Sequence, residues 1–161
     1  MHTVGFGELY EQYSNDVLRF ALYLTGSRSD TEDITSETFV RAWLSTAPIR
    51  SGTVKSYLLA IARNLHVERY REAGRRGSMP EEVADPAPGP EAWASGRDDV
   101  RALISELQRL PEIDRAALLM KAQEGLSYAE IAAALEISVA AARVKVHRAR
   151  LRLHEWRAAR S

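Results

Sequence analysis

Positive charge recurs at close spacing near the carboxyl end of the chain, within residues 138–153 (SVAAARVKVHRARLRL). At 100° per residue, one apolar stripe contains Val139, Ala142, Val146, Ala149 and Leu153. Such a stripe is typical of a helix packed on a small core. The opposite side of the helix carries Ala140, Ala141, Val144, His147 and Arg148. Cationic residues flank this face, with Arg143 and Arg150 on one edge and Lys145 and Arg152 on the other. Long cations can reach both phosphate ridges of a DNA groove while small residues approach the bases, although a solvated basic face has the same pattern.

The segment before this helix favours the DNA interpretation. Ser127 and Glu130 have the spacing of a capping box, which predicts that a short helix begins there and stops near Glu136. Ser138 can then cap the basic helix. Two helices joined in this way have the spacing of a helix-turn-helix, in which the second helix enters the major groove. A plain helical hairpin remains the alternative.

Three stretches of the chain resemble a known family. The C-terminal stretch contains Leu110-Pro111-Glu112, EGLSYAEIAAALEIS (124–138) and HRAR (147–150), and it is similar to the upstream-promoter-reading domain of extracytoplasmic-function (ECF) sigma factors of bacterial RNA polymerase. Residues 27–43 and 56–71 resemble the core-polymerase-binding helix and the promoter-melting helix of the same family, in the expected order. The matches cover about residues 5–72 and 100–156.

The resemblance implies a role for each basic or exposed set. For the upstream (−35) element the implied residues are Ala140, Ala141, Arg143, Val144, Lys145, His147, Arg148, Arg150 and Arg152. Among these, Arg148 is the first candidate for a base contact, Val144 for a thymine methyl group and Lys145 for a phosphate. The chain has Glu136 where the family commonly has a glycine with positive φ, so the turn is either strained or differently shaped.

The N-terminal helices receive two further assignments. For the downstream (−10) element and DNA melting, the implied residues are Lys55, Tyr57, Arg63, Asn64 and Arg71. Arg63, Asn64 and Arg71 are expected to face solvent, whereas Tyr57 has either a stacking role or a core role. For polymerase binding, the implied residues are Asp33, Ser36, Glu37 and Val40, with Ser36 in place of the usual Gln. Their helix is expected to start with a Ser29–Glu32 capping box and to bury Ile34, Phe39 or Val40, Ala42 and Trp43.

Charge is balanced over the whole chain but not along it. The 22 cations equal the 22 acids, yet residues 51–77 carry +4, residues 78–100 carry −5 and residues 137–161 carry +6. The Pro- and Gly-rich stretch 74–98 has no helical period and is expected to be a flexible acidic linker, in which Trp93 could dock on a partner or on either domain. The prediction is an all-α protein of two small domains, 1–73 and 99–161, joined by this linker and with the helix-turn-helix in the second.

Composition also limits the chemistry that the chain can perform. It contains no cysteine, its four histidines have no metal-ligand spacing, and no catalytic triad or phosphate-binding glycine loop is present. We therefore expect no enzymatic activity, no catalytic residue, no metal and no cofactor. No run approaches the ~20 apolar residues of a membrane span, so the chain is expected to be cytoplasmic with no membrane contact of its own.

The resemblance implies a sigma factor that takes core RNA polymerase to promoters and helps to open them. Its partners would be core RNA polymerase, promoter DNA (double-stranded upstream and single-stranded downstream) and an anti-sigma factor. Two alternatives stay open at this stage. A helix-turn-helix repressor or activator would dimerise on operators without polymerase, and a pure interaction module would never touch DNA.

Overall fold

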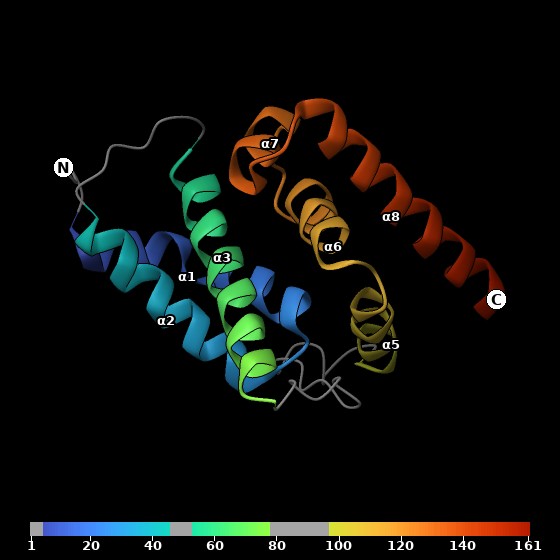
Figure 1. The fold of residues 1–161 in the computed structure, drawn as a ribbon, viewed down its shortest axis with the longest axis horizontal. Helices are drawn as coiled ribbons and strands as arrows, with labels where there is room; N and C mark the ends of the chain where they lie inside the picture. The colour runs from blue at the N-terminus through green and yellow to red at the C-terminus, as the bar shows by residue number, and fades with distance from the viewer. Residues whose placement is uncertain (1–4, 46–52, 78–96) are drawn as a thin grey trace.

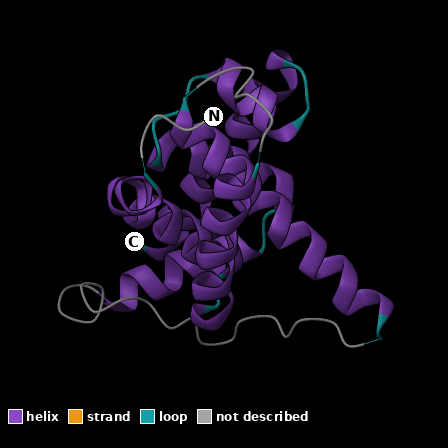
Figure 2. Ribbon diagram, turned by 90° about the vertical axis from the view of Figure 1, so that its left-hand side faces the viewer, coloured by secondary structure: helices purple, strands orange, loops and turns teal. Residues whose placement is uncertain are grey.

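The computed structural model describes residues 5–45, 53–77 and 97–161 of the chain. All regular structure in these ranges is helical (Figure 2). Hydrophobic residues at helical spacing account for this, since each helix presents a stripe that must be buried against another. The all-α prediction, with a helix-turn-helix in the second half, is confirmed.

The N-terminal half consists of α1 (Phe6–Thr25), α2 (Arg28–Leu44) and α3 (Val54–Arg75). The three helices pack around fully buried side chains, of which Phe20, Phe39 and Leu58 are among the largest. Gly26 ends α1 in the left-handed conformation, with φ of 70°. A Cβ at this position would lie 3.1 Å from the side chain of Gln108, so both the conformation and the close approach favour glycine.

Two expectations for α2 are wrong. The cap is Ser27, whose hydroxyl accepts from the Asp30 amide, and not Ser29. Ser27 has the extended backbone that a cap requires, whereas Ser29 already lies inside the helix. Trp43, which is predicted to be buried, is 39% exposed. Of the two alternatives Phe39 and Val40, Phe39 is fully buried in the core and Val40 is 46% exposed.

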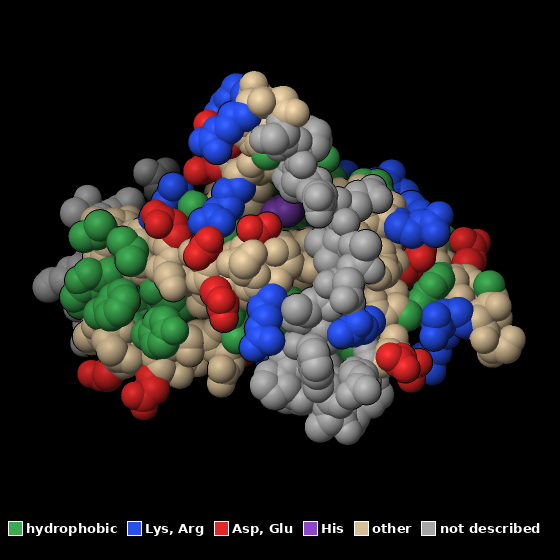
Figure 3. Space-filling model, turned by 90° about the horizontal axis from the view of Figure 1, so that it is seen from below, with side chains coloured by type: hydrophobic (Ala, Val, Ile, Leu, Met, Phe, Trp, Pro, Cys, Tyr) green, Lys and Arg blue, Asp and Glu red, His purple; other side chains and the backbone are tan. Residues whose placement is uncertain are grey.

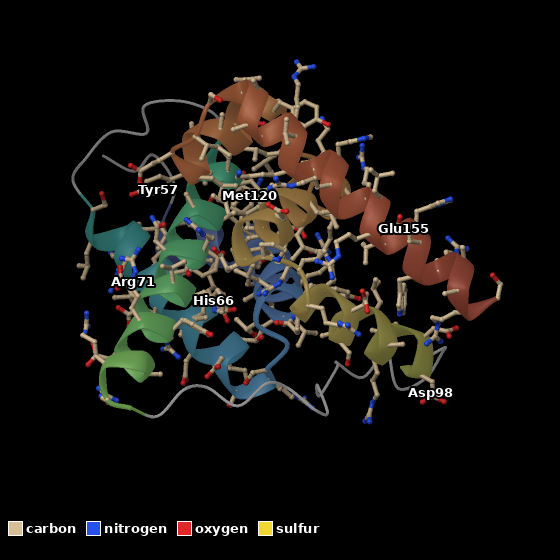
Figure 4. The ribbon with its side chains drawn as sticks, turned by 45° about the vertical axis from the view of Figure 1, so that its right-hand side comes forward. Tyr57, His66, Arg71, Asp98, Met120 and Glu155 are labelled. Carbon is tan, nitrogen blue, oxygen red and sulfur yellow. The ribbon has the colours of Figure 1, made fainter. Side chains whose placement is uncertain are left out.

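The C-terminal half consists of α5 (Arg97–Gln108), α6 (Glu112–Leu118), the π-helical turn η1 (Leu119–Gln123), α7 (Tyr128–Leu135) and α8 (Val139–Arg160). Met120 is fully buried where η1 and α6 meet α7 and α8 (Figure 4). Helix α8 runs from its junction with α7 along the outer edge of this half (Figure 1). One face of α8 is therefore packed on α6 and the opposite face is open.

The two halves pack against each other. Helix α3 lies beside α7, and α1 contacts α5, α6 and η1 (Figure 1). Polar groups join them: Gln108 Nε2 donates to the Tyr23 carbonyl at 3.0 Å, and the buried Arg115 guanidinium donates to the Leu24 carbonyl at 2.6 Å. The Glu130 carboxylate accepts from the Thr53 amide at 3.1 Å. Helix α3 continues to Arg75 and α5 begins at Arg97. Residues 78–96, which make up most of the predicted linker and include Trp93, lie outside the described residues.

Candidate nucleic-acid interface

The two helices of the helix-turn-helix begin at the serines that the sequence indicated. Ser127 accepts from the Glu130 amide at 3.1 Å while Glu130 Oε1 accepts from the Ser127 amide at 2.9 Å, which confirms the capping box. The ionised Glu130 carboxylate accepts hydrogen bonds from the Ser127 amide and from the Thr53 amide. These two bonds, and the one from Ser127 above all, hold the pKa of Glu130 below its usual range. Ser138 caps α8 by accepting from the Ala141 amide at 3.0 Å.

The turn between α7 and α8 keeps the left-handed geometry despite its glutamate. Glu136 has φ of 57° and ψ of 47°. The Ile137 amide donates to the Ala132 carbonyl at 3.0 Å and the Glu136 amide to the Ala133 carbonyl at 3.4 Å, the bonding pattern of a Schellman motif. The sequence left open whether this turn is strained or differently shaped, and the structure has the strained turn. The turn sets α8 across α7.

Helix α8 is divided into a packed face and an open face. Ala142, Val146 and Ala149 are fully buried, so the predicted apolar stripe is confirmed along its middle, whereas Val139 at its start is 40% exposed. The open face contains exposed Ala140, Arg143, Val144, His147, Arg148, Arg150 and Arg152, with half-buried Ala141 and Lys145. All the residues implied for the upstream element therefore lie outside the packed face of α8, and we call the surface that they form the α8 basic face.

Two arginines of the α8 basic face are held by neighbouring helices. The Arg143 guanidinium lies 4.9 Å from the centre of the Tyr128 ring, which also carries the Lys121 ammonium at 4.4 Å. Arg148 pairs in a bidentate manner with Asp114, at 3.3 Å from Nε to Oδ2 and 3.0 Å from Nη2 to Oδ1. Both contacts restrict the conformations of long side chains before any partner is bound.

The α3 residues implied for DNA melting do not share one surface. Asn64 and Arg71 are exposed as expected, and Arg71 lies on the outer side of α3, away from the C-terminal half (Figure 4). Tyr57 is half-buried against the core, near the end of α3 that meets α7. The solvent-facing position expected for Arg63 is wrong, because its side chain is only 16% exposed and pairs with Glu112, at 2.9 Å from Nε to Oε2. Lys55 also faces the other half, 3.2 Å from Glu124.

Sequence reasoning missed the residues that join the halves. The Glu124 side chain is completely buried and accepts from Arg19 at 2.9 and 3.0 Å. Arg115 is buried too. It donates to the carbonyls of Leu24, Leu107 and Leu110, forms no ion pair with a carboxylate of the described residues, and has a pKa lowered by desolvation. No local pattern could have shown these contacts, since Arg19 and Glu124 are 105 residues apart in the sequence.

The residues implied for polymerase binding lie together on the outside of α2. Asp33, Ser36, Glu37 and Val40 are all exposed. Arg69 lies 3.6 Å from Asp33, and Arg41 lies 3.4 Å from Glu37, so two of the acids are paired with exposed cations.

Hydrophobic side chains gather beside these α2 residues, over the end of the molecule where α1 begins and α2 ends (Figure 3). Exposed there are Phe6 (38%), Tyr10 (43%), Trp43 (39%) and Leu44 (71%), and Phe6 meets Trp43 edge to face at 5.7 Å. Grouped apolar side chains rimmed by charge are typical of a protein-binding surface.

Two kinds of site do not occur in the described part of the chain. Within residues 5–45, 53–77 and 97–161, His, Asp and Glu side chains form no group that could hold a metal ion. No helix in these ranges combines the length and apolar character that a membrane crossing requires.

Comparison with known proteins identifies both halves. Residues 9–76 match the family model described as Sigma-70 region 2, and residues 101–153 match Sigma-70 region 4. ECF RNA polymerase sigma factor SigE of Mycolicibacterium smegmatis is 35% identical over 98% of this chain, which spans 63% of SigE. ECF RNA polymerase sigma factor SigC of Mycobacterium tuberculosis is 36% identical over 84% of this chain and 74% of SigC.

A solved structure has the same arrangement of helices. The sigma factor RpoE of Bartonella quintana, in complex with the anti-sigma factor NepR, superimposes with a TM-score of 0.80 at 26% identity, covering 93% of this chain and 94% of RpoE. The matches in sequence and in fold extend over both halves in the same order. The chain belongs to the ECF sigma factors of the sigma-70 family.

Proposed function

We propose that this chain binds core RNA polymerase, directs it to specific promoters and helps to open the DNA for initiation of transcription. The observation that carries the proposal is the open α8 basic face. It belongs to the second helix of a capped helix-turn-helix in a region 4 segment, and a region 2 segment precedes it in the chain. The chain would supply no catalysis of its own. The work divides between residues 1–73 and residues 99–161, joined by residues 74–98.

The α8 basic face reads the upstream element. Val144, 53% exposed, offers a methyl contact, and Arg148, which pairs with Asp114 but keeps a 55% exposed side chain, contacts a base or the adjacent backbone. Lys145, Arg150 and Arg152 lie at the edges of the face, where they neutralise phosphates. His147 lies between the cations and contributes to packing or to a phosphate contact.

The N-terminal half binds polymerase through α2 and DNA through α3. Asp33, Ser36, Glu37 and Val40 provide an exposed acidic and apolar surface, continuous with exposed Trp43 and Leu44. Asn64 and Arg71 are exposed for contact with the separated strand, and Lys55, Tyr57 and Arg63 join them once they are accessible. Opening a duplex costs a few kcal/mol per disrupted step, which stacking and phosphate neutralisation recover.

An anti-sigma factor is a further proposed partner. The Bartonella quintana RpoE structure contains one, and its similarity covers nearly all of the present chain. We place the protein in the cytoplasm, where core RNA polymerase is found.

In vitro transcription tests the proposed function. The full chain is added to purified bacterial core RNA polymerase on a library of genomic fragments, and the 5′ ends of the transcripts are sequenced. We expect starts at a limited set of sites that share an upstream and a downstream element, with none from core polymerase alone. A control variant, Arg157→Ala, changes an exposed cation outside the nine implied residues and should preserve these starts.

The same preparation separates the alternatives. A dimeric operator-binding protein would self-associate and bind a palindrome tightly without polymerase. A pure interaction module would neither bind DNA nor change the start sites. Either result contradicts the sigma-factor proposal.

A further inference from the structure

Three cations of the N-terminal half lie against carboxylates of the C-terminal half. We call Arg19, Lys55 and Arg63 the masked strip. Two of its members share the Glu124 carboxylate: Arg19 donates at 2.9 and 3.0 Å, and the Lys55 ammonium lies 3.2 Å from the same side chain. Glu124 has no exposed side-chain surface. Its charge is thus balanced by cations from α1 and α3, neither of which belongs to its own half.

The third cation has a carboxylate of its own. Arg63 donates from Nε and Nη2 to the two oxygens of Glu112, at 2.9 and 2.5 Å, with exposed fractions of 16% and 27% for the two side chains. The parallel pair of N–H groups of a guanidinium matches a phosphate as well as it matches a carboxylate. Glu112 therefore presents to Arg63 a pair of oxygens like those that a backbone phosphate would present.

The masked strip has the dimensions of a nucleic-acid contact. Lys55 and Arg63 are eight residues apart on α3, which places them on one side of the helix, about 12 Å apart along its axis. Arg19 on α1 adjoins Lys55, because both lie within 4 Å of Asp16 and of Glu124. A row of cations of this length can follow several nucleotides of a strand.

We propose that the masked strip is a DNA-backbone site that Glu112 and Glu124 fill in the closed chain, so that the chain shields its own downstream-element surface until the halves separate. The proposal rests on the sigma-factor function and adds the backbone contact of Arg19 and the blocking role of the two acids. The masking is selective. The α8 basic face is open in the same structure, so the closed chain presents its upstream-reading surface while it covers Lys55 and Arg63.

The other contacts between the halves suit a reversible closure. They include single hydrogen bonds from Gln108 to the Tyr23 carbonyl, from Arg115 to the Leu24 carbonyl and from the Thr53 amide to Glu130. Water can replace each of these partners on opening, and phosphates can replace the two acids. A polymerase surface that binds the two halves at separate places could therefore pull them apart, and it would also have to offset the exposure of apolar side chains that the halves bury together.

The first experiment measures opening in the free, full-length chain. Because the sequence contains no cysteine, Glu32→Cys on α2 and Glu155→Cys on α8, both exposed, accept a fluorescent donor and acceptor specifically. Glu112→Gln with Glu124→Gln removes both masking charges and keeps the side-chain shapes. We expect lower energy transfer in this double variant. The matched control is Asp98→Asn with Glu106→Gln, which removes two acids that form no ion pair within the described residues, and it should keep the wild-type transfer.

The second experiment measures the affinity of the same free proteins for a fluorescent single-stranded 20-mer of mixed sequence. We expect the unmasked variant to bind about tenfold more tightly than wild type, and the control pair to bind no more than about twofold more tightly. Adding Lys55→Gln and Arg63→Gln to the unmasked variant should abolish the gain while energy transfer stays low. If the double variant does not fold, Glu112→Gln alone, at the more accessible pair, should give a smaller change in the same direction.

The masking proposal would be overturned if the folded Glu112→Gln, Glu124→Gln variant kept the wild-type energy transfer and the wild-type affinity for the single strand. It would also be overturned if the Asp98→Asn, Glu106→Gln control gained as much affinity as this variant. These outcomes are independent of the transcription assay. Promoter-specific starts with no opening would leave the sigma function intact and exclude masking. Opening with a strip-dependent gain in affinity, but no transcription, would contradict the sigma function and leave the masked strip as a nucleic-acid site.

Discussion

Arg148 on α8 donates to both carboxylate oxygens of Asp114 on α6, so the side chain implied for base contact also ties the recognition helix to the core beneath it. Asp114 is 3% exposed, whereas the Arg148 side chain is 55% exposed. The acid is the buried partner and depends on the arginine for its charge compensation. The arginine keeps an open side from which it can reach DNA.

Arg148→Ala should lower the free energy of unfolding by about 1–3 kcal/mol, because it leaves the Asp114 carboxylate buried without its ion-pair partner. Arg152→Ala removes an exposed arginine from the same helix and should change stability by less than about 0.5 kcal/mol. Urea denaturation followed by circular dichroism measures both. Equal effects of the two substitutions would show that the pair with Asp114 contributes nothing.

Lys145→Ala should weaken binding of the polymerase complex to all upstream sequences alike and reduce the salt dependence of binding by about one unit, since a phosphate contact carries no sequence information. Arg148→Ala should instead change the order of preference among upstream elements. Selection from a randomised upstream element at two salt concentrations distinguishes these outcomes. A preference that changes with Lys145 and not with Arg148 would reverse the proposed roles.

Glu136→Gly should stabilise the protein by about 0.5–1 kcal/mol, because the residue has φ of 57° and glycine adopts this conformation without the Cβ penalty. Glu136→Ala retains the Cβ and should give no such gain. Thermal unfolding of the two variants beside wild type provides the measurement. A loss of stability in the glycine variant would mean that the glutamate side chain contributes more than the strain it causes.

His66 should make the protein less stable as the pH falls from about 6.5 to about 4. Desolvation lowers its pKa to about 4, on a face of α3 surrounded by Glu112, Arg115, Asp30 and Arg63 (Figure 4). The unfolded chain binds a proton near pH 6.5, whereas the folded chain does not, so stability is full above this pH and decreases below it, by at most about 1.4 kcal/mol per pH unit.

His66→Gln should flatten this part of the stability profile, measured by urea denaturation at half-unit steps of pH. His154→Gln changes an exposed histidine and should leave the slope as in wild type. A wild-type slope that persists in the His66 variant would assign the proton uptake to another group.

Polymerase binding and DNA opening should be separable by substitution. Asp33→Lys with Glu37→Lys should weaken binding to core polymerase, because the exposed acids of α2 are reversed. Asn64→Ala with Arg71→Ala should leave that binding near wild type and reduce formation of the open complex. Fluorescence anisotropy with core polymerase and permanganate footprinting of open DNA measure the two steps. Equal losses of both steps in the Asn64 and Arg71 variant would count against a melting role.

The features that the sequence predicted correctly depend on partners a few residues apart. Ser127 and Glu130 cap each other, and Ser138 caps the helix that follows it, because both motifs are complete within one turn. The cap of α2 was misplaced for the same local reason. Ser27 and Ser29 both precede acids at suitable spacing, and only the backbone conformation, extended at Ser27, separates them.

Contacts between distant helices could not be predicted in this way. Arg63 was expected in solvent because α3 considered alone presents it there, yet Glu112 on α6, 49 residues later, covers it. Trp43 was expected in the core because it continues the apolar pattern of α2, but it meets Phe6 at the surface. A periodic pattern indicates which face of a helix is apolar, and it does not indicate which charged groups of another helix will approach the polar face.

The carboxylate of Glu130 serves two helix beginnings, with Oε1 on the Ser127 amide and Oε2 on the Thr53 amide. Thr53 also has an acceptor of its own, the Ser56 hydroxyl at 3.0 Å. When the interface opens, each N-terminus therefore retains a cap from its own segment, and only Glu130 Oε2 is released to water. Both helix starts at this contact are capped within their own segments, so a rearrangement of the two halves of the chain need not melt any secondary structure there.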